Sequence, residues 1–412
     1  MERTDQIPHV VIVGGGVAGL EALMALRDLA GDRVEMTLVA PEPDFTYKPL
    51  AVEEPFSHQP PEQRALEPIA REFGGRFLQA AVERVALDEH GVELSTGETL
   101  EYATLLVCVG GRPKPAFRQG TTFLASGEPL RIDDVLANAA AAPSRSIAFV
   151  VPPGVTWPLP IYEVALMARR RAESLGLSEL EHVVVTPESA PLIMFGSVAS
   201  GEVEALLRAR GIAVETSTYA HEVGGGPLIL TPGDRRLDAG GLVALPLIEG
   251  PGVAGLPCDK HGFIPIDDHA RVSGTEDVYA AGDGTTFPIK QGGIATQQAD
   301  AAAEHIASRM GAPVDPRPFQ PVLRGKLLTG GESLHLKHDL RGGTGEGAVA
   351  LDYLWWPPHK ISGRYLAAWL GETTPHADPE PPRHPIEVEV SLPREWHREP
   401  MALDPYGPLG LD

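Results

Sequence analysis

"VVIVGGGVAGLEALMALRDLAG", residues 10–31, decides the fold of this chain. The apolar run Val10–Val13 predicts a buried strand, and the leucines that follow at helical spacing predict a helix packed on a sheet. Gly14, Gly16 and Gly19 form a GxGxxG motif at the turn between them. The run "VEMTLVAP" at residues 34–41 predicts the next strand, so the chain opens with a complete βαβ unit.

A glycine motif between a strand and a helix predicts a dinucleotide site. The missing side chains let the backbone approach a pyrophosphate, and the helix N-terminus offers N–H groups and a positive dipole. A carboxylate for the adenosine ribose is expected about 20 residues after the last glycine. Ala40 occupies the end of the predicted strand, so the candidate is Glu42, and the alternative is that Glu42 is a solvated loop carboxylate.

Two segments, residues 77–111 and 214–250, share one order of elements. Each predicts a strand, a hairpin with a glycine-containing turn and a returning strand. The positions that match, with one insertion, are Leu94, Gly97 and Leu100 against Leu230, Gly233 and Leu237. We therefore predict an α/β fold in which two Rossmann-like three-layer domains stand in tandem, followed by a small C-terminal cap.

The predicted domain boundaries follow this repeat. The first domain takes residues 1–117 and, after the second domain, residues 247–315. The second domain takes residues 118–246, and the cap takes residues 316–372. Residues 373–412 are rich in proline and acidic residues, which predicts a flexible or draped tail.

Composition restricts the partners. The chain has 412 residues and a formal net charge of −22, which disfavours nucleic acid and anionic lipid as partners. It has no apolar run long enough for a membrane span, and its start lacks the regions of a secretory signal. Cys108 and Cys258, the two cysteines, cannot form a disulfide framework, so the prediction is a cytoplasmic protein. The sequence does not decide whether the protein forms a homodimer.

A second predicted strand–loop–helix unit resembles a nucleotide-binding unit, but the residues of its loop do not suit phosphate binding. "IAFVVPPGVTWPLPIYEVALMARRR", residues 147–171, predicts a strand, a loop and a helix. Prolines and Trp157 stand where a phosphate requires glycines, and only Gly154 remains. Because proline lacks an N–H and side chains block close approach, the usual phosphate contact is not expected here.

Three segments together resemble a known family. "VIVGGGVAGLEA", "LLVCVGGRP" and "DVYAAGDGT" with the following "KQGGIATQQADAAAEHIA" are similar to flavoproteins with two dinucleotide-binding domains. Within this pyridine nucleotide-disulfide oxidoreductase superfamily, the chain resembles the branch of sulfide:quinone oxidoreductases and type II NADH dehydrogenases. The resemblance covers about residues 8–370 and implies a non-covalent FAD in the first domain.

The resemblance also implies which residues contact FAD. The pyrophosphate would lie on the glycines of the first motif, and backbone groups at Val82 would contact adenine. The remaining implied contacts are the closing turn Gly110 and Gly111, the ribityl pair Gly282 and Asp283, the ring loop with Lys48 and Pro49, and the helix start at Ile294 and Ala295. Lys290, close to that helix start, would stabilise negative charge on the reduced cofactor, and the alternative is a surface lysine.

The second loop limits the chemistry that the resemblance implies. Trp157 takes the place of a redox cysteine before the pair Tyr162 and Glu163, so sulfide oxidation through cysteine is disfavoured. The leading hypothesis is an FAD-dependent oxidoreductase that passes two electrons from a small donor to a quinone-like or other acceptor. One alternative is an NAD(P)H:acceptor oxidoreductase that binds NAD(P)H in a non-standard way. The other is a non-enzymatic flavoprotein whose flavin is occluded.

Each of the other candidate site residues also has a purely structural explanation. Trp157 would stack near the flavin or else pack between domains, and Glu163 would act as a general base or else be a first-turn carboxylate favoured by the helix dipole. An aromatic group with Trp355, Trp356 and Lys360 would line a quinone-like acceptor pocket or else belong to the core. A shallow aromatic contact with a membrane is a further expectation. No metal site is predicted, because "HLKH" has no third ligand nearby.

Overall fold

The computed structural model describes residues 7–57, 62–123, 130–223, 226–340 and 347–373. The predicted tail, from residue 374 onward, lies outside these described residues. Within the described ranges, no helix has both the length and the apolar character that a membrane crossing needs.

The first sheet is parallel and has the strand order β20-β9-β1-β2-β5. Its strands are β1 His9–Val13, β2 Glu35–Ala40, β5 Gly75–Gln79, β9 Thr104–Val107 and β20 Val278–Ala280. Val10 and Ile12 pack with the helices α1 (Val17–Ala30) and α7 (Gly292–Arg309), whereas Val11 and Val13 pack under an antiparallel meander. Both faces are thus covered, which explains why the strand is a continuous apolar run.

Smaller elements complete this unit. The meander is β6 Val82–Ala86, β7 Gly91–Leu94 and β8 Thr99–Glu101. A connection between β2 and β5 holds β3 Asp44–Thr46, α2 Glu54–Ser57, β4 Gln63–Ala65 and α3 Leu66–Glu72. Together with the helices, the meander makes the three layers that the sequence predicts for the first unit.

The second unit repeats this plan. Its parallel sheet has the order β11-β18-β12-β13-β14. The strands are β11 Thr121–Thr122, β12 Ser146–Val150, β13 Glu181–Val185, β14 Ile212–Glu215 and β18 Gly241–Ala244. The helices are α4 Ile132–Ala141, α5 Leu159–Ser174 and α6 Ser197–Ala209. The meander is β15 Tyr219–Glu222, β16 Leu228–Thr231 and β17 Arg235–Arg236. The matched glycines Gly97 and Gly233 both have positive φ at hairpin turns, so the predicted internal repeat is confirmed.

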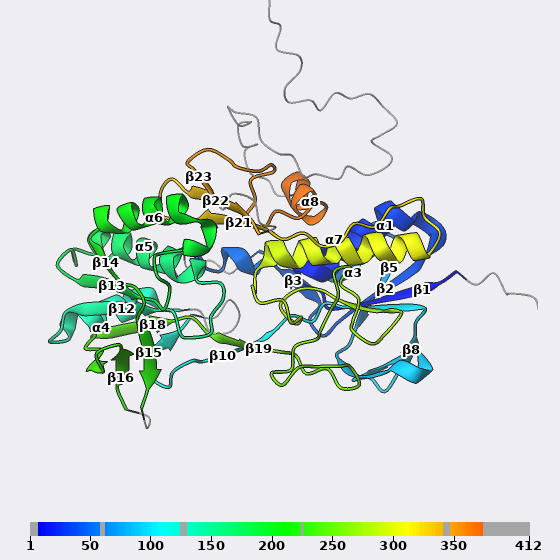
Figure 1. Ribbon diagram of the computed structural model, residues 1–412, viewed down its shortest axis with the longest axis horizontal. Coiled ribbons are helices and arrows are strands. Elements are labelled where there is room, and N and C mark those ends of the chain that lie inside the picture. The colour runs from blue at the N-terminus through cyan, green and yellow to red at the C-terminus, as the bar shows by residue number, and fades with distance from the viewer. Residues whose placement is uncertain (1–6, 58–61, 124–129, 224–225, 341–346, 374–412) are drawn as a thin grey trace, which may run out of the picture.

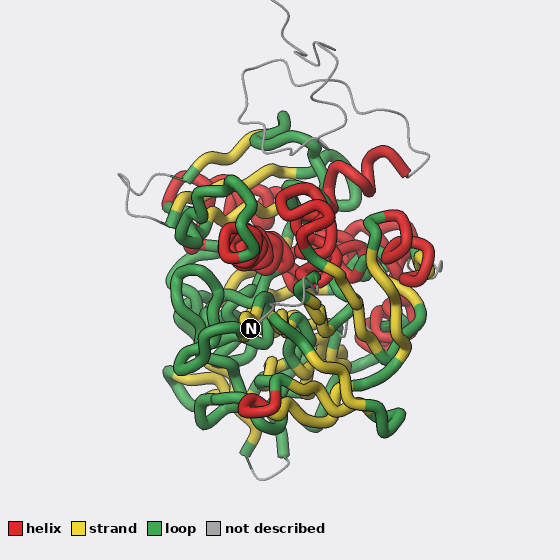
Figure 2. The backbone as a smooth tube through the Cα atoms, turned by 90° about the vertical axis from the view of Figure 1, so that its right-hand side faces the viewer, coloured by secondary structure: helices red, strands yellow, loops and turns green. Residues whose placement is uncertain are grey.

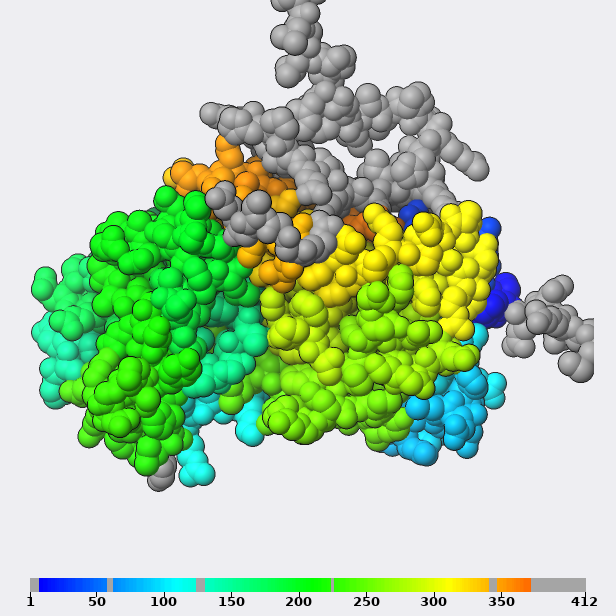
Figure 3. All heavy atoms as spheres, in the orientation of Figure 1, coloured from blue at the N-terminus to red at the C-terminus, as the bar shows by residue number. Residues whose placement is uncertain are grey.

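A C-terminal cap lies over both units. Its antiparallel sheet is β21 Val322–Leu327, β22 Leu334–Asp339 and β23 Ala348–Ala350, and its helix is α8 Leu366–Thr373. Leu323 and Leu336 belong to the core of the second unit, whereas Tyr365 and Leu366 belong to the helical core of the first. Figures 1 and 3 show the cap, in orange, above both lobes, and Figure 2 shows the helices between cap strands and sheets. On the far side of these helices, β10 Arg112–Lys114 pairs with β19 Leu247–Glu249 where the chain passes between the units.

Glu21 joins the first unit to the cap. Although it lies on a helix otherwise buried by apolar contacts, its side chain is completely buried. Its carboxylate oxygens accept the N–H groups of Tyr365 at 2.9 Å and Leu366 at 2.8 Å, at the start of α8. Burial raises the pKa of Glu21, and these two N–H groups oppose the rise. One acidic side chain thus satisfies the start of a helix that is distant in sequence.

We predict that Glu21→Ala destabilises the protein. Because two buried N–H groups lose their acceptor, the free energy of unfolding should fall by about 2–5 kcal/mol. The measurement is denaturant-induced unfolding followed by circular dichroism. Glu67→Ala removes a carboxylate of an exposed i,i+4 pair with Arg71 and should stay within about 0.5 kcal/mol of the wild type. Equal effects of the two substitutions would contradict the anchoring role of Glu21.

Candidate active site

A cavity of about 700 Å³ opens at the carboxyl edge of the first sheet. This volume falls in the range of about 300–1,000 Å³ that is typical of small-molecule and cofactor sites. The cavity begins at the glycine loop between β1 and α1 and reaches Asp283, Gly292 and the cap residue Ile361. Ligands of parallel α/β sheets bind at this edge.

The three glycines of the motif have different roles. A Cβ on Gly14 would lie 2.2 Å from the carbonyl oxygen of Cys108, and one on Gly19 would lie 1.9 Å from the carbonyl oxygen of Gly14. These two positions are therefore glycine because of packing. Gly16 also lines the cavity, and a Cβ added there would meet no protein atom within 4 Å. Gly16 thus leaves space for a ligand, which is the arrangement that a pyrophosphate requires.

The N-terminus of α1 faces this space. Its N-cap is Gly16, so no side chain covers the first N–H groups of the helix. Gly110, which lines the same cavity, has positive φ and no atom within 4 Å of an added Cβ. Open backbone at both positions in the cleft, with a helix dipole at one end, fits a bound pyrophosphate.

Most predicted FAD contacts line the cavity. They are Gly14, Gly16, Glu42, Lys48, Pro49, Val82, Gly110, Gly111, Gly282, Asp283 and Ala295. Arg112, Asp44 and Ile361 line it as well and were missed. Arg112 directly follows the glycine pair, which was an available signal, whereas nothing in the sequence near Ile361 connects the cap with this cleft.

Two predicted contacts lie elsewhere. Gly19 is behind the loop, for the packing reason given above. Ile294 does not begin the helix: α7 starts at Gly292, and Ile294 is buried in the core of the second unit. Its N–H is taken by the side chain of Gln291, the N-cap, at 2.8 Å. The expectation that Ile294 faces the cofactor is therefore wrong, and Gly292 and Ala295 line the cleft instead.

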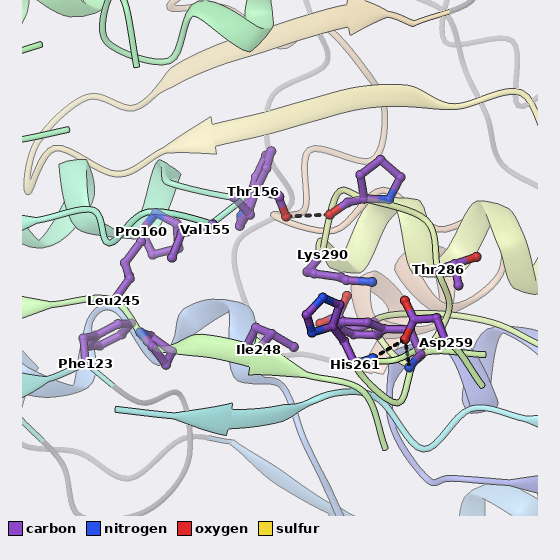
Figure 4. Close-up of a pocket in the computed structure, with 16 residues that line it drawn as sticks. Phe123, Val155, Thr156, Pro160, Leu245, Ile248, Asp259, His261, Thr286 and Lys290 are labelled. Carbon is purple, nitrogen blue, oxygen red and sulfur yellow. Dashed lines mark hydrogen bonds between the residues drawn. The ribbon is translucent and has the colours of Figure 1, made fainter. Parts of the chain in front are cut away.

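A second cavity, of about 390 Å³, lies between the second unit and the residues before α7. Figure 4 shows an apolar end with Phe123, Leu245 and Pro160 and a polar end with Lys290 and Asp259. Asp283 lines both this cavity and the cofactor cleft. Asp283 therefore forms a wall that the two spaces share.

Charged groups are held close together at this shared wall. Lys290 donates to the carbonyl oxygens of Thr285 at 2.5 Å and Phe287 at 2.8 Å, and it lies 3.9 Å from the centre of the Phe263 ring. Burial lowers the pKa of Lys290 to about 8, although Asp283 and Asp259 oppose this change. Burial raises the pKa of Asp283 to about 6, opposed by Lys290 and Lys48. Both side chains thus titrate near neutral pH, as groups that exchange protons with substrates often do.

Trp157 lies beside the second cavity and packs against the core of the second unit, and its stacking near the flavin stays a prediction. It lines the second cavity, and its ring packs edge-on against Phe195 with centroids 5.8 Å apart. Partly buried, it also packs against the core of the second unit. Its place in the loop before α5 makes it a wall of the cavity that is fixed by packing.

Glu163 and the predicted acceptor pocket require correction. Glu163 lines neither cavity; it is fully buried, pairs with Lys360 at 2.7 Å and accepts the Leu328 N–H at 2.9 Å. A general base needs access to its substrate, which this position does not give. Trp355 is a core residue whose indole donates to the His359 carbonyl at 3.1 Å, and Trp356 packs edge-on against Tyr353. Trp355, Trp356 and Lys360 thus belong to packing and ion-pair contacts of the cap. They line neither of these cavities.

Both cysteine thiols have raised pKa values. Burial raises the pKa of the Cys108 thiol to about 12, and this residue lines the cofactor cleft near the glycine loop. Cys258 is exposed, and partial desolvation and the neighbouring Asp259 raise the pKa of its thiol. Raised pKa values disfavour the thiolate form that reacts in cysteine chemistry. The described ranges also contain no cluster of three or more metal-ligating side chains.

The comparison with known families decides the assignment. The family profile "Pyridine nucleotide-disulphide oxidoreductase" matches residues 8–304. The chain belongs to this family. Its members bind FAD in the first dinucleotide domain, and the open backbone at Gly16 and Gly110 fits that cofactor. The named relatives of this family are oxidoreductases.

Known proteins support the same fold. The chain is 28% identical to the sulfide-quinone reductase of Aquifex aeolicus (strain VF5) over 182 residues, which cover 41% of this chain and 40% of that protein. It is 27% identical to the rhodocoxin reductase of Rhodococcus erythropolis over 301 residues, covering 68% and 65%. The solved sulfide:quinone oxidoreductase of Aquifex aeolicus superposes with a TM-score of 0.74 at 20% identity, covering 84% and 87%. Both of these curated matches span less than two thirds of the relative's length.

We predict that Gly16→Ala weakens FAD binding without unfolding the protein. The added methyl group would occupy ligand space, and overpacking costs typically about 1–3 kcal/mol. The dissociation constant for FAD should therefore rise roughly ten- to a hundredfold. The control is Gly201→Ala on α6, where an added Cβ also meets no atom within 4 Å but no cleft is lined. Fluorescence titration of the FAD-free proteins measures both constants, and equal affinities would contradict the assignment.

We predict that Asp283 makes stability depend on pH in a defined direction. Its pKa is raised from 3.8 to about 6 in the folded protein, so between about pH 4 and 6 the native state holds a proton that the unfolded chain has lost. The free energy of unfolding of the wild type, relative to Asp283→Asn, should fall by up to about 1.4 kcal/mol per pH unit in this range, and less where solvent screens the carboxylate. Urea unfolding at several pH values measures the difference. A difference that stays constant over this range would contradict the shift.

Proposed function

We propose that the protein transfers two electrons from a small organic donor, bound in the 390 Å³ cavity, to a quinone-like acceptor, without redox cysteines. Bound FAD supplies the two-electron chemistry, and the protein supplies binding, orientation and charge. The observation that supports the proposal is that Asp283 lines both the donor cavity and the cofactor cleft.

The loop before α5 favours an organic donor over a nicotinamide dinucleotide. Pro158 is the N-cap of α5 and Pro160 is in its first turn, so two N–H groups that would bind a phosphate are missing. Glu188 follows β13 at the place where a ribose-binding acid is expected. Its Oε2 already accepts the Tyr162 hydroxyl at 2.6 Å and the Thr186 hydroxyl at 2.9 Å. A dinucleotide would have to compete with these contacts.

The cavity itself suggests the kind of donor. Phe123, Leu245 and Ile248 would hold an apolar body, while Lys290 and Asp283 would face the reacting polar group. We assign to Asp283 the exchange of a proton with the donor, and to Lys290 the compensation of negative charge that develops there. Trp157 shapes the wall and excludes water.

The acceptor would approach from the side of Lys48, Pro49 and Ile361, where the cap closes the cofactor cleft. These three residues of the cofactor cleft do not line the donor cavity. Two separate approaches allow donor and acceptor to react in turn. The name of the relative in Aquifex aeolicus, a sulfide-quinone reductase, supports a quinone-like acceptor.

NAD(P)H is the second candidate donor, because β12, the loop and α5 keep the frame of a nucleotide site and Gly154 keeps a positive φ. In that case the dinucleotide would bind along the loop without the usual glycine contacts. The same cavity would then receive its nicotinamide end.

Anaerobic reduction of the FAD-loaded protein separates the candidates. We expect NADH, NADPH and sodium sulfide to bleach the flavin absorbance slowly, and a member of a panel of small alcohols, amines and hydroquinones to bleach it at catalytic speed. Ubiquinone-1 should then restore the absorbance. Rapid reduction by NADH or NADPH would select the second candidate. No reduction by any donor would favour the non-enzymatic alternative and would refute the proposal.

A substitution in the donor cavity tests its location. The arginine side chain of Val155→Arg should fill the cavity and weaken donor binding by about 3 kcal/mol. Reduction of the flavin by the active donor should therefore slow by roughly a hundredfold. Val198→Arg, at an exposed position of α6, is the matched control and should reduce at the wild-type rate. Stopped-flow absorbance measures both rates. Equal rates for the two variants would place the donor elsewhere.

A further inference from the structure

The buried ion pair of Glu163 and Lys360 connects α5 with the cap. Glu163 has 0% exposed area and the Lys360 side chain has 9%, and their charged atoms are 2.7 Å apart. The other carboxylate oxygen of Glu163 accepts the N–H of Leu328, just after β21, at 2.9 Å. A buried pair of this kind costs desolvation energy and contributes little net stability, so its effect must be sought in the geometry that it fixes.

The residue after Lys360 forms a wall of the cofactor cleft. Ile361 is 3% exposed and lines this cleft, and its N–H donates to the Tyr47 hydroxyl at 3.0 Å. Its side chain lies directly against Gly292, where an added Cβ would be 2.3 Å from Ile361 Cδ1. Ile361 therefore touches the start of α7 and the residue before Lys48, both at the end of the cleft where the family resemblance implies the flavin ring.

We infer that Glu163 is a positioning residue, which holds the Ile361 wall against the ring end of the cofactor cleft through Lys360. Apolar contacts alone would let the cap segment slide along α5. The ion pair and the Leu328 contact define one position for this segment, because a displaced carboxylate would leave Lys360 buried without a partner. This role needs FAD in the cleft but does not depend on which donor or acceptor reacts.

The same helix also carries the donor side. The loop with Val155, Thr156 and Trp157 leads directly into α5, four residues before Glu163. One rigid helix therefore supports both the donor cavity and, through Lys360, the cap wall. Moving the cap wall should change the surroundings of bound FAD while the donor loop stays in place.

The test compares Glu163→Gln with Glu204→Gln, which removes a carboxylate from an exposed ion pair at 2.7 Å on α6. Both proteins are loaded with FAD, and the visible absorption bands, quenching of flavin fluorescence by iodide and reoxidation after dithionite by ubiquinone-1 are measured. A displacement of about 1 Å costs up to about a hundredfold in rate, so reoxidation of Glu163→Gln should slow by roughly ten- to a hundredfold. Its flavin bands should shift and iodide should quench more strongly, while Glu204→Gln matches the wild type.

Two further variants keep the inference testable if Glu163→Gln fails to fold. Tyr47→Phe removes the hydroxyl that accepts the Ile361 N–H and should shift the bands in the same direction by a smaller amount. Glu163→Gln combined with Lys360→Met should recover part of the loss, since no charge is then buried alone. Lower thermal stability with wild-type bands, quenching and reoxidation would overturn the inference. Because dithionite replaces the donor, failure of the proposed donor chemistry would leave this test unaffected.

Discussion

Close contact between backbone segments at the first glycine turn is the constraint on which the structure depends. Gly14 approaches the carbonyl oxygen of Cys108 at the end of β9, and Gly19 approaches Gly14 itself, so any side chain at either position would collide with backbone. This crowding places the start of α1 at the carboxyl edge of the sheet. Only because those two glycines bring the helix so near can Gly16 leave an open, positively polarised space for a pyrophosphate.

The second unit keeps the frame and loses this constraint. The strand β12 and the helix α5 stand in the same relation as β1 and α1, yet prolines and Trp157 fill the connection. Proline at the helix start removes N–H groups but fits the first turn of a helix well, so the fold tolerates what phosphate binding does not. The prolines therefore disfavour ligands that carry a phosphate. The space that remains is an apolar cavity that ends at Lys290 and Asp283.

Local patterns in the sequence predicted the repeat and the first glycine turn, because glycine turns and apolar runs act over a few residues, whereas most residues of the cofactor cleft were predicted from motifs that resemble a known family. Gly110, Asp283 and Lys48 lie in such motifs, and all three line the cleft. Errors arose where the outcome depends on distant packing. The Gln291 side chain, which caps α7, also donates to the carbonyl of Arg324, 33 residues away, and the environment of Glu163 is set by Lys360, 197 residues away. Neither contact leaves a pattern in one sequence.

The two units also contact the cap through equivalent residues. Glu21 and Glu163 each lie four residues after the first residue of their helices, α1 at Val17 and α5 at Leu159. Both are fully buried, and both accept N–H groups from the cap. A carboxylate at this place in a helix has no solvent, so it requires donors from whatever covers it. The repeat thus provides two fixed acceptors, one per unit, and a cap that satisfies both has a defined position over both. The cofactor cleft is closed by residues between these two anchor points, which is why the relative position of the units and the wall at Ile361 are set together.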